Sequence, residues 1–321
     1  MSQENSLHPK YTKPLPKAVA IYPNMPRRIA FWCIGVFAIF LRLITVPFRC
    51  FSKKSNTYLV YEPYGMGDVI ALQPFVLALA NSGSKVIVAV KEEWQEILPK
   101  HENVKFVSTQ VSYSKYRNKK IGLFKTLIST ARILRCEARG AVALDIRGDV
   151  RSICLMYLAG CSKIESFNRY FTANDCRVPL GSVSKRVKID RTLLRYELNK
   201  LLLPKAALEK FTFSDLSHLI DPATAQDLPA ETVALVPLAG WDGKEWIPEF
   251  WKELISMLKE TGRNVAVVHG PSEQEKAMSA VGTTGVKFVE AVAVKEWVNI
   301  LNSASYVISV NTGPMHIAAA L

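Results

Sequence analysis

Four segments of the sequence join a short apolar run to a loop that carries glycine and a polar side chain. The first is Tyr58–Ile70, in which Gly65 and Gly67 precede Asp68. Glycines at such a turn let the backbone bend sharply and approach a ligand. A carboxylate that follows a strand can serve as a general base, although Asp68 alone could equally be a helix N-cap. The dinucleotide fingerprint G-x-G-x-x-G is excluded, because isoleucine stands at the third glycine position.

The second and third segments place single charged side chains after apolar runs. Lys244 follows the run Val233–Pro237, and Glu273 follows the run Val265–His269. A lysine in such a loop can offset the charge of a phosphate, or it can simply be solvated. Glu273 can accept hydrogen bonds from ribose hydroxyls, or it can favour the start of a helix through the helix dipole.

The fourth segment, Tyr306–Ala319, is the most specific. Its strand stops at Asn311, and Pro314 stands where proline prefers to begin a helix. The free N–H groups of residues 312, 313 and 315, together with the helix dipole, would form an anion site suited to a diphosphate. His316 would point toward that site from the first helical turn.

Strand-like runs alternate with helical patterns from residue 58 onward, which predicts parallel sheets with helices on both faces. The predicted strands are Tyr58–Tyr61, Val86–Val90, Val104–Val107, Ala141–Ile146, Val233–Pro237, Val265–His269, Val286–Val289 and Tyr306–Val310. The predicted helices include Val69–Ala80, Phe124–Arg139, Asp190–Leu203, Glu249–Thr261 and Val294–Ser303. We expect an α/β fold of two doubly wound domains that face a cleft, because ligands of such sheets bind beyond the carboxyl ends of the strands.

The pattern thins between about residues 169 and 231, where we place the boundary between two domains. The predicted divisions are a flexible lead-in at 1–26, a hydrophobic and basic helix at 27–54, an N-terminal α/β domain at 55–214, a linker at 215–229 and a C-terminal α/β domain at 230–321.

Charge and cysteine content limit the class of protein. The net charge of +13 is concentrated in residues 1–57, with nine Lys and Arg against one acid, and in residues 111–190, with 16 against six. Such a field attracts polyanions, or it is a solvated surface. Nucleic-acid binding is not favoured, because no helix-turn-helix, zinc-finger or RNP-type signature is present. The six cysteines lack C-x-x-C spacing, which indicates reduced thiols rather than a disulfide framework or a zinc site.

A hydrophobic segment near the N-terminus indicates contact with a membrane. Ile29–Leu41 is an unbroken apolar run that Arg42 interrupts. We favour a helix lying in the membrane interface with basic flanks, while a spanning helix and a helix buried against the protein remain alternatives. A cleaved signal peptide fits poorly, because the lead-in is long and no small-residue cleavage site follows.

Taken together, these segments resemble glycosyltransferase family 9, the heptosyltransferase family. The resemblance rests on the Gly67-Asp68 turn, the segment Leu144–Ser152, the lysine loop Lys244–Pro248, the turn Gly270–Glu273 and the segment Asn311–Ala318. It covers residues 58 to 321. It implies the two-domain GT-B fold and inverting transfer of heptose from ADP-heptose to the lipopolysaccharide core, without a metal or other cofactor.

The resemblance also implies roles for individual residues. Asp68 would be the catalytic base, Lys244 would lie beside the diphosphate, and Glu273 would hold the ribose. Residues 312–316 would form the donor-binding turn, through Thr312, Gly313 and His316. The residue before that Thr-Gly pair is usually Asp in the family, whereas Asn311 stands here, with an amide that has lost the charge.

The resemblance therefore predicts transfer of a sugar, heptose, to an anionic glycolipid at the cytoplasmic side of the bacterial inner membrane. The sequence contains no Asp-x-Asp motif, so a metal-clamped diphosphate is not predicted. The chain ends inside the helix that follows residue 313, where family members continue, so we expect an incomplete C-terminal domain. The alternative is a weak or inactive truncated remnant that binds nucleotide or membrane.

Overall fold

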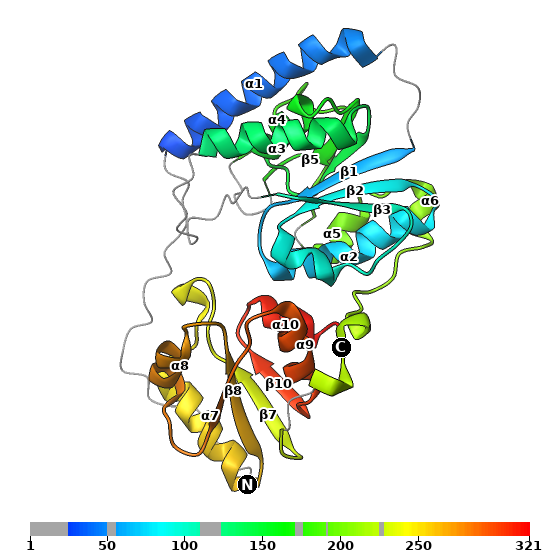
Figure 1. Cartoon of the computed structure of the whole chain (residues 1–321). Helices are drawn as coiled ribbons and strands as arrows, with labels where there is room; N and C mark the ends of the chain where they lie inside the picture. The colour runs from blue at the N-terminus through cyan, green and yellow to red at the C-terminus, as the bar shows by residue number, and fades with distance from the viewer. Residues whose placement is uncertain (1–24, 50–55, 110–122, 171–175, 191, 225–227) are drawn as a thin grey trace, which may run out of the picture.

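Two parallel β-sheets, each covered by helices on both faces, form the molecule (Figure 1). The computed structural model describes residues 25–49, 56–109, 123–170, 176–190, 192–224 and 228–321. The predicted α/β class, with two doubly wound halves, is confirmed.

The N-terminal sheet has six strands in the order β3-β2-β1-β4-β5-β6, all parallel. The strands are β1 Thr57–Glu62, β2 Lys85–Val90, β3 Val104–Ser108, β4 Val142–Asp145, β5 Lys163–Phe167 and β6 Lys185–Val187. The central strand β1 is buried from Leu59 onward, as expected for a parallel strand with helices on both sides. The loop between β1 and α2 therefore lies at the edge of the sheet where β4 also ends.

Helices cover the two faces of this sheet as separate layers. One layer packs Leu72, Phe75 and Leu79 against the sheet and faces the C-terminal half (Figure 1). It consists of α2 Met66–Asn81, α5 Arg195–Lys200 and α6 Lys205–Leu208, with the 3₁₀ turn η1 Glu92–Ile97 beside it. The other layer consists of α3 Leu123–Ala138 and α4 Val150–Leu158.

Helix α1, Met25–Arg49, lies outside the second layer and packs along α4 (Figure 1). It corresponds to the hydrophobic and basic helix that the sequence predicts at 27–54, of which residues 50–54 lie outside the described residues. The predicted lead-in likewise lies outside them as far as residue 24. Residues 28–45 are long and apolar enough to cross a membrane by length and composition, and 11% of that window is buried.

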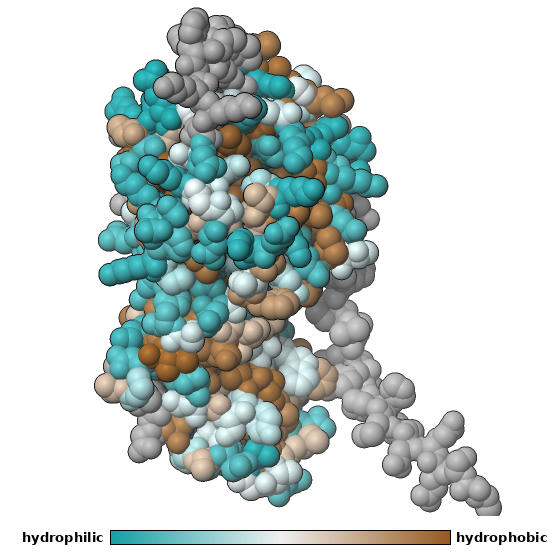
Figure 2. Space-filling model, turned by 90° about the vertical axis from the view of Figure 1, so that its right-hand side faces the viewer, coloured by the Kyte–Doolittle hydropathy of each residue, from teal (hydrophilic) through white to brown (hydrophobic). Residues whose placement is uncertain are grey.

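The C-terminal sheet has four strands in the order β10-β7-β8-β9, all parallel. They are β7 Thr232–Val236, β8 Asn264–His269, β9 Lys287–Glu290 and β10 Tyr306–Ser309. Two helices cover each face: α7 Pro248–Glu260 and α8 Gln274–Val281 on one, α9 Val294–Asn302 and α10 Gly313–Ala318 on the other. β10 is an edge strand of this sheet. Hydrophobic side chains gather on the surface of the C-terminal half in the view of Figure 2.

The two halves meet where α10 packs against α2. One hydrophobic cluster runs without interruption from Leu72 and Val76 of α2 to Ile300 of α9 and Ile317 of α10. Because this cluster joins helices from both halves, it fixes the carboxyl edge of one sheet opposite the carboxyl edge of the other.

The segment that connects the halves is hydrogen-bonded to both of them. The side chain of Gln73 on α2 donates to Asp215 O at 2.7 Å and accepts from Asp215 N at 2.7 Å. Asp221 N donates to Asn299 Oδ1 on α9 at 2.7 Å. The segment includes the 3₁₀ turns η2 Ser217–Leu219 and η3 Pro222–Thr224, and residues 225–227 of the predicted linker lie outside the described residues. The predicted domain limits stay a prediction.

All eight predicted strands are present, each within two residues of its expected limits. The structure also contains elements that were not predicted, among them α4, α6, β5 and β6. The helix predicted at Asp190–Leu203 is shorter, and begins at Arg195. The Asp190 carboxylate accepts hydrogen bonds from the backbone N–H and the hydroxyl of Thr192, which holds that stretch in a turn.

Candidate functional site

Asp68 lies in the first turn of α2, where the carboxyl end of β1 gives way to a glycine-containing loop. The helix N-cap is Gly65, and its carbonyl accepts a hydrogen bond from Asp68 N at 3.1 Å. The N-cap interpretation of Asp68 is therefore wrong. Its side chain instead reaches Arg147, with Nη2 and Oδ1 2.6 Å apart, and remains one-third exposed.

Arg147 ties Asp68 to a second, fully buried carboxylate. Its Nε and Nη2 donate to the two carboxylate oxygens of Glu62 at 3.0 Å each, in a bidentate pair. The Glu62 side chain has no exposed surface and that of Arg147 is 3% exposed. Arg195 approaches Glu62 from α5 at 3.9 Å. Two carboxylates and two guanidiniums thus balance their charge inside the edge of the sheet.

The balance of burial and ion pairing decides the charge of each carboxylate. Burial raises the pKa of Asp68, but Arg147 and Arg195 outweigh it and hold the pKa below its ordinary value. Burial raises the pKa of Glu62 above its ordinary value, against the opposing effect of Arg147. Asp68 is therefore ionised at neutral pH, with one-third of its side chain exposed.

The segment that carries Arg147 forms a tight turn between β4 and α4. Asp145, at the end of β4, accepts hydrogen bonds from the backbone N–H groups of Arg147 and Asp149 at 3.2 and 3.0 Å. Gly148 has a φ of +66°, and a Cβ there would lie 1.9 Å from the carbonyl oxygen of Arg169. Only glycine fits such a turn, so the local sequence fixes where the Arg147 guanidinium can reach.

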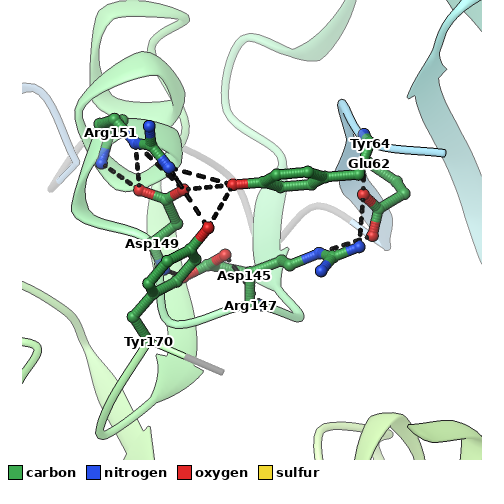
Figure 3. Close-up of polar contacts among 7 residues, drawn as sticks. All are labelled: Glu62, Tyr64, Asp145, Arg147, Asp149, Arg151 and Tyr170. Atoms are coloured by element: carbon green, nitrogen blue, oxygen red, sulfur yellow. Dashed lines mark hydrogen bonds and ion pairs between the residues drawn. The ribbon is translucent and has the colours of Figure 1, made fainter. Parts of the chain in front are cut away.

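A second polar cluster lies beside this turn (Figure 3). Asp149 caps α4 and pairs with Arg151, whose Nη2 lies 2.6 Å from Oδ2. The Tyr64 hydroxyl donates to Asp149 Oδ2 at 3.1 Å and lies 2.6 Å from the hydroxyl of Tyr170. The Arg147 guanidinium stacks on the Tyr64 ring, 4.1 Å from its centroid. The ring of Tyr64 thus joins the two clusters.

Lys244 and Asn311 meet at the carboxyl edge of the C-terminal sheet. Lys244 ends the 3₁₀ turn η4, Asp242–Lys244, that follows β7, and Asn311 follows β10, the neighbour of β7. Lys244 Nζ lies 3.5 Å from Asn311 Oδ1, and both side chains are exposed. A long contact between exposed groups leaves the lysine ammonium available to a ligand.

Glu273 and Thr312 line one pocket at the same edge. Its walls come from the ends of β7 and β8, the start of α10 and, across the opening, Met66 of α2. Glu273 occupies the N-cap position of α8, so the helix begins one residue later than expected, and its Oε2 accepts from Gly270 N at 3.0 Å. The pocket lies where ligands of doubly wound sheets bind.

The turn at residues 313–316 packs directly on the turn at residues 65–68. A Cβ on Gly67 would lie 2.4 Å from His316 Cδ2, and a Cβ on Gly313 would lie 2.4 Å from Met66 Cε. Two glycines, one from each half, therefore permit this approach. The structure brings together Asp68 and His316, which lie 248 positions apart in the sequence.

The surroundings of His316 favour its neutral form. Burial lowers its pKa below the ordinary value, Lys244 lowers it further, and Asp68 opposes both. A neutral imidazole beside an ionised carboxylate can accept or donate a hydrogen bond without adding charge to the pocket. Across the residues that the structure describes, no group of three or more His, Cys, Asp or Glu is arranged to hold a metal ion.

Comparison with known proteins identifies the family. The model of glycosyltransferase family 9 (heptosyltransferase) matches residues 136–321. The chain belongs to this family.

Relatives and solved structures agree with that membership. Lipopolysaccharide heptosyltransferase 1 of Escherichia coli K12 is 35% identical over 82 residues, which is 25% of this chain and 26% of that protein. The matched segment thus spans about a quarter of the length of the curated relatives. E. coli heptosyltransferase WaaC, solved with ADP-2-deoxy-2-fluoro heptose, has a TM-score of 0.59 at 21% identity, over 82% of this chain and 85% of that one.

A further E. coli structure, ADP-heptose lps heptosyltransferase II, has a TM-score of 0.57 at 15% identity, with 82% of each chain covered. At these identities the likeness shows the fold, which is the GT-B arrangement of two parallel sheets. Because the family match begins at residue 136, it includes Arg147 and the whole C-terminal edge but neither Asp68 nor Glu62.

In this family member, the sequence alone did not reveal Glu62, Arg147 and Arg195. The signal for Arg147 was present, because the segment Leu144–Ser152 follows a predicted strand and is rich in charge. Glu62 closes a strand that is otherwise apolar, and a charged residue at the carboxyl end of a central strand is a reasonable candidate for a site. Arg195 carried no such signal, since its position depends on how α5 packs on α2.

Proposed function

We propose that the chain is an inverting glycosyltransferase that moves a sugar, heptose from ADP-heptose, onto a lipopolysaccharide core or related anionic glycolipid. The observation that carries the proposal is that ionised Asp68 acts on His316 across the contact of the two halves, next to the turn whose Thr312 lines a pocket together with Glu273. Family membership supplies the reaction class. One similar structure is named an ADP-heptose lps heptosyltransferase, and another was solved with ADP-2-deoxy-2-fluoro heptose.

The proposed mechanism is a direct displacement. The acceptor hydroxyl attacks the anomeric carbon while Asp68 takes the hydroxyl proton, so a new carbon–oxygen bond forms as the bond to the diphosphate breaks. The bonding electrons leave with the nucleoside diphosphate, whose growing charge meets Lys244 and the backbone N–H groups at the start of α10. Attack from the face opposite the leaving group inverts the anomeric centre. No metal or other cofactor takes part in this scheme.

Each remaining predicted residue has a place in this scheme. Glu273 accepts hydrogen bonds from the ribose, and Asn311 contacts the donor sugar as a neutral amide. Thr312, Gly313 and His316 form the turn that holds the diphosphate. Gly65 and Gly67 keep the acceptor-side loop free of side chains where the donor approaches. The acceptor would be an anionic glycolipid. The chain would bind it as a peripheral enzyme at the cytoplasmic side of the bacterial inner membrane.

The test is sugar transfer by the purified full chain from ADP-heptose to a core acceptor that lacks heptose, with release of ADP as the readout. Asp68→Asn should reduce transfer by about 10²- to 10⁴-fold, the range for loss of a general base, while affinity for ADP measured by calorimetry stays near that of the wild type. Asp242→Asn is the matched control, because Asp242 is an 89% exposed acid on the donor side. Transfer that survives in Asp68→Asn would show that another group is the base.

A second candidate is a protein that binds nucleotide without transferring sugar. It is favoured by Asn311, which stands where the resemblance places an aspartate. This candidate predicts that the wild type binds ADP but never releases it from ADP-heptose, and that Asn311→Asp restores turnover. Turnover by the wild type excludes it.

A further inference from the structure

Helix α1 is apolar on both of its faces. The inner face packs on α4, with Phe31 and Ala38 buried, and Gly35 so close to Pro179 that a Cβ would lie 2.5 Å from its Cγ. The outer face carries large apolar side chains that are 42–65% exposed: Ile29, Trp32, Val36, Phe37, Phe40 and Leu43. A helix on the surface of a soluble protein normally has a polar outer face, so this face needs a partner.

Arg42, the sole charged residue between positions 29 and 44, is turned away from the outer face. Its Nη1 donates to the carbonyl oxygens of Gly181 and Val183, at 2.7 Å each. Leu180, between Pro179 and Gly181, is 79% exposed at the border of the helix. The arginine that would be costly inside lipid is therefore satisfied within the protein, and it fastens the second half of α1 to the domain.

The neighbouring surface is basic. Arg132, Arg135 and Arg139 are exposed on or just after α3, spaced so that they share a side of that helix, and α3 packs against α4 next to α1 (Figure 1). An apolar helix face with exposed arginines on a nearby helix matches the structure of an anionic bilayer surface, with acyl chains below and phosphates around them. Neither a soluble partner nor a second copy would need both features.

We propose that α1 is an in-plane membrane anchor, which stays docked on α4 and inserts its outer face into the surface of an anionic bilayer without crossing it. Helix α1 rises about 37 Å over its 25 residues, enough to span, so length does not decide the question. Spanning would require the helix to leave α4, expose its inner face and carry Arg42 into lipid. Because α1 lies on the layer opposite α2, the anchor leaves the opening between the two halves uncovered.

The first experiment is sedimentation of the full chain with vesicles of phosphatidylcholine, with or without 30% phosphatidylglycerol. Partition to the anionic vesicles should fall about 100-fold in Phe37→Glu/Phe40→Glu, which removes two aromatic side chains from the lipid. The matched control is Met257→Glu, a 59% exposed position on α7 of the other half. Equal partition of the two variants would overturn the proposal.

The arginines on α3 should account for lipid selectivity. Each of Arg132→Gln, Arg135→Gln and Arg139→Gln should lower partition to anionic vesicles by up to about fivefold, and none should alter partition to pure phosphatidylcholine. Unchanged thermal melting shows that these exposed changes leave the fold intact. Lipid-free dimerisation that Phe37→Glu/Phe40→Glu abolishes, with no vesicle binding by the wild type, would overturn the proposal in favour of a second copy.

The second experiment separates a flat helix from a spanning one. Nitroxide labels are placed at Ile29→Cys, near one end of the apolar stretch, or at Val36→Cys, near its middle, after Cys33, Cys50 and Cys136 have been changed to serine. The two positions lie about 10 Å apart along the helix axis. Equal depths measured by paramagnetic relaxation support the in-plane anchor, and depths that differ by most of that length overturn it. Neither experiment involves sugar transfer, so the anchor and the proposed enzymatic activity can fail independently.

Discussion

The carboxyl edges of the two sheets are built in opposite ways. At the N-terminal edge, Glu62 and Arg147 are almost completely buried, and two hydrogen bonds join the Arg147 guanidinium to the Glu62 carboxylate. At the C-terminal edge, Lys244 and Asn311 are exposed and share one contact of 3.5 Å. The first edge is rigid before any ligand arrives, whereas the second leaves its charged group ready to contact one.

This difference suits different tasks. A group that must accept a proton in one geometry gains from fixed neighbours, because misplacement of the reacting atoms slows the chemical step. A group that meets a diphosphate can move to it, since a lysine ammonium acts as a flexible point charge. The following variants should therefore affect stability at the N-terminal edge and ligand binding at the C-terminal edge.

The largest effect is expected from Arg147→Met. This change leaves the carboxylate of Glu62 buried without its bidentate partner, and loss of one member of a buried ion pair typically costs about 3–5 kcal/mol. Chemical denaturation measures the change in the free energy of unfolding. Adding Glu62→Gln to the same chain should recover part of the loss, because the unpaired charge is then gone.

The control for Arg147→Met is Lys105→Met, which breaks the ion pair between Lys105 and Glu137 on the surface of the same half. Exposed pairs contribute about 0–1 kcal/mol. Similar losses in the two variants would show that the N-terminal edge is not the rigid one.

The next largest effect is expected where the two edges touch. In Gly67→Ala, the new Cβ would lie 2.4 Å from His316 Cδ2, so α10 must shift relative to α2. Such overpacking costs about 1–3 kcal/mol, and calorimetry should show a lower melting temperature together with weaker binding of ADP. Gly65→Ala, two residues away, is the matched control for the melting temperature, because a Cβ there meets no atom within 4 Å. Equal melting temperatures of the two alanine variants would place the contact elsewhere.

Much of this architecture could be predicted, because it depends on local patterns. The sequence shows apolar runs at β1, β7, β8 and β10, and glycines follow each of them. Together they mark a strand, a turn and the start of a helix within a short stretch of sequence. β6 escaped prediction because its three residues, Lys185–Val187, show no alternation and are largely exposed. α4 has only nine residues, mostly apolar, which resemble a buried strand as much as a helix.

The site could be predicted only in part, for a related reason. The glycines next to Asp68 mark it as a candidate in the sequence, but its ion pair with Arg147 joins residues 79 positions apart. No local pattern shows which arginine of a basic segment turns inward. The same limit applies to Arg42, whose two carbonyl partners lie about 140 residues away, and which the sequence alone showed only as an interruption of the apolar run.

A smaller effect is expected at the C-terminal edge from Lys244→Ala. Because Lys244 is exposed, the free energy of unfolding should change by less than about 0.5 kcal/mol. Affinity for ADP, measured by titration calorimetry, should fall about tenfold or more, since hydrogen bonds to charged groups contribute about 1.5–3 kcal/mol. Lys252→Ala, which removes an exposed lysine from α7, should leave affinity unchanged. An ADP affinity that is equal in both variants would remove Lys244 from the donor site.

The smallest effect is expected on the pKa of His316, which depends on one residue from each edge. Burial and Lys244 lower this pKa, while Asp68 raises it. Lys244→Ala should therefore raise the pKa, since a nearby cation is lost, and Asp68→Asn should lower it, since a nearby anion is lost. Proton NMR titration of the imidazole measures both shifts.

The lowered pKa also sets the sign of a pH effect on stability. The folded-state pKa of His316 lies below the value of about 6.5 expected in the unfolded chain. Stability linked to neutral His316 is therefore complete above the unfolded pKa and is lost as the pH falls through the folded pKa. That loss should be smaller in Lys244→Ala and larger in Asp68→Asn. Shifts of the same sign in both variants would mean that the two edges do not face each other across His316.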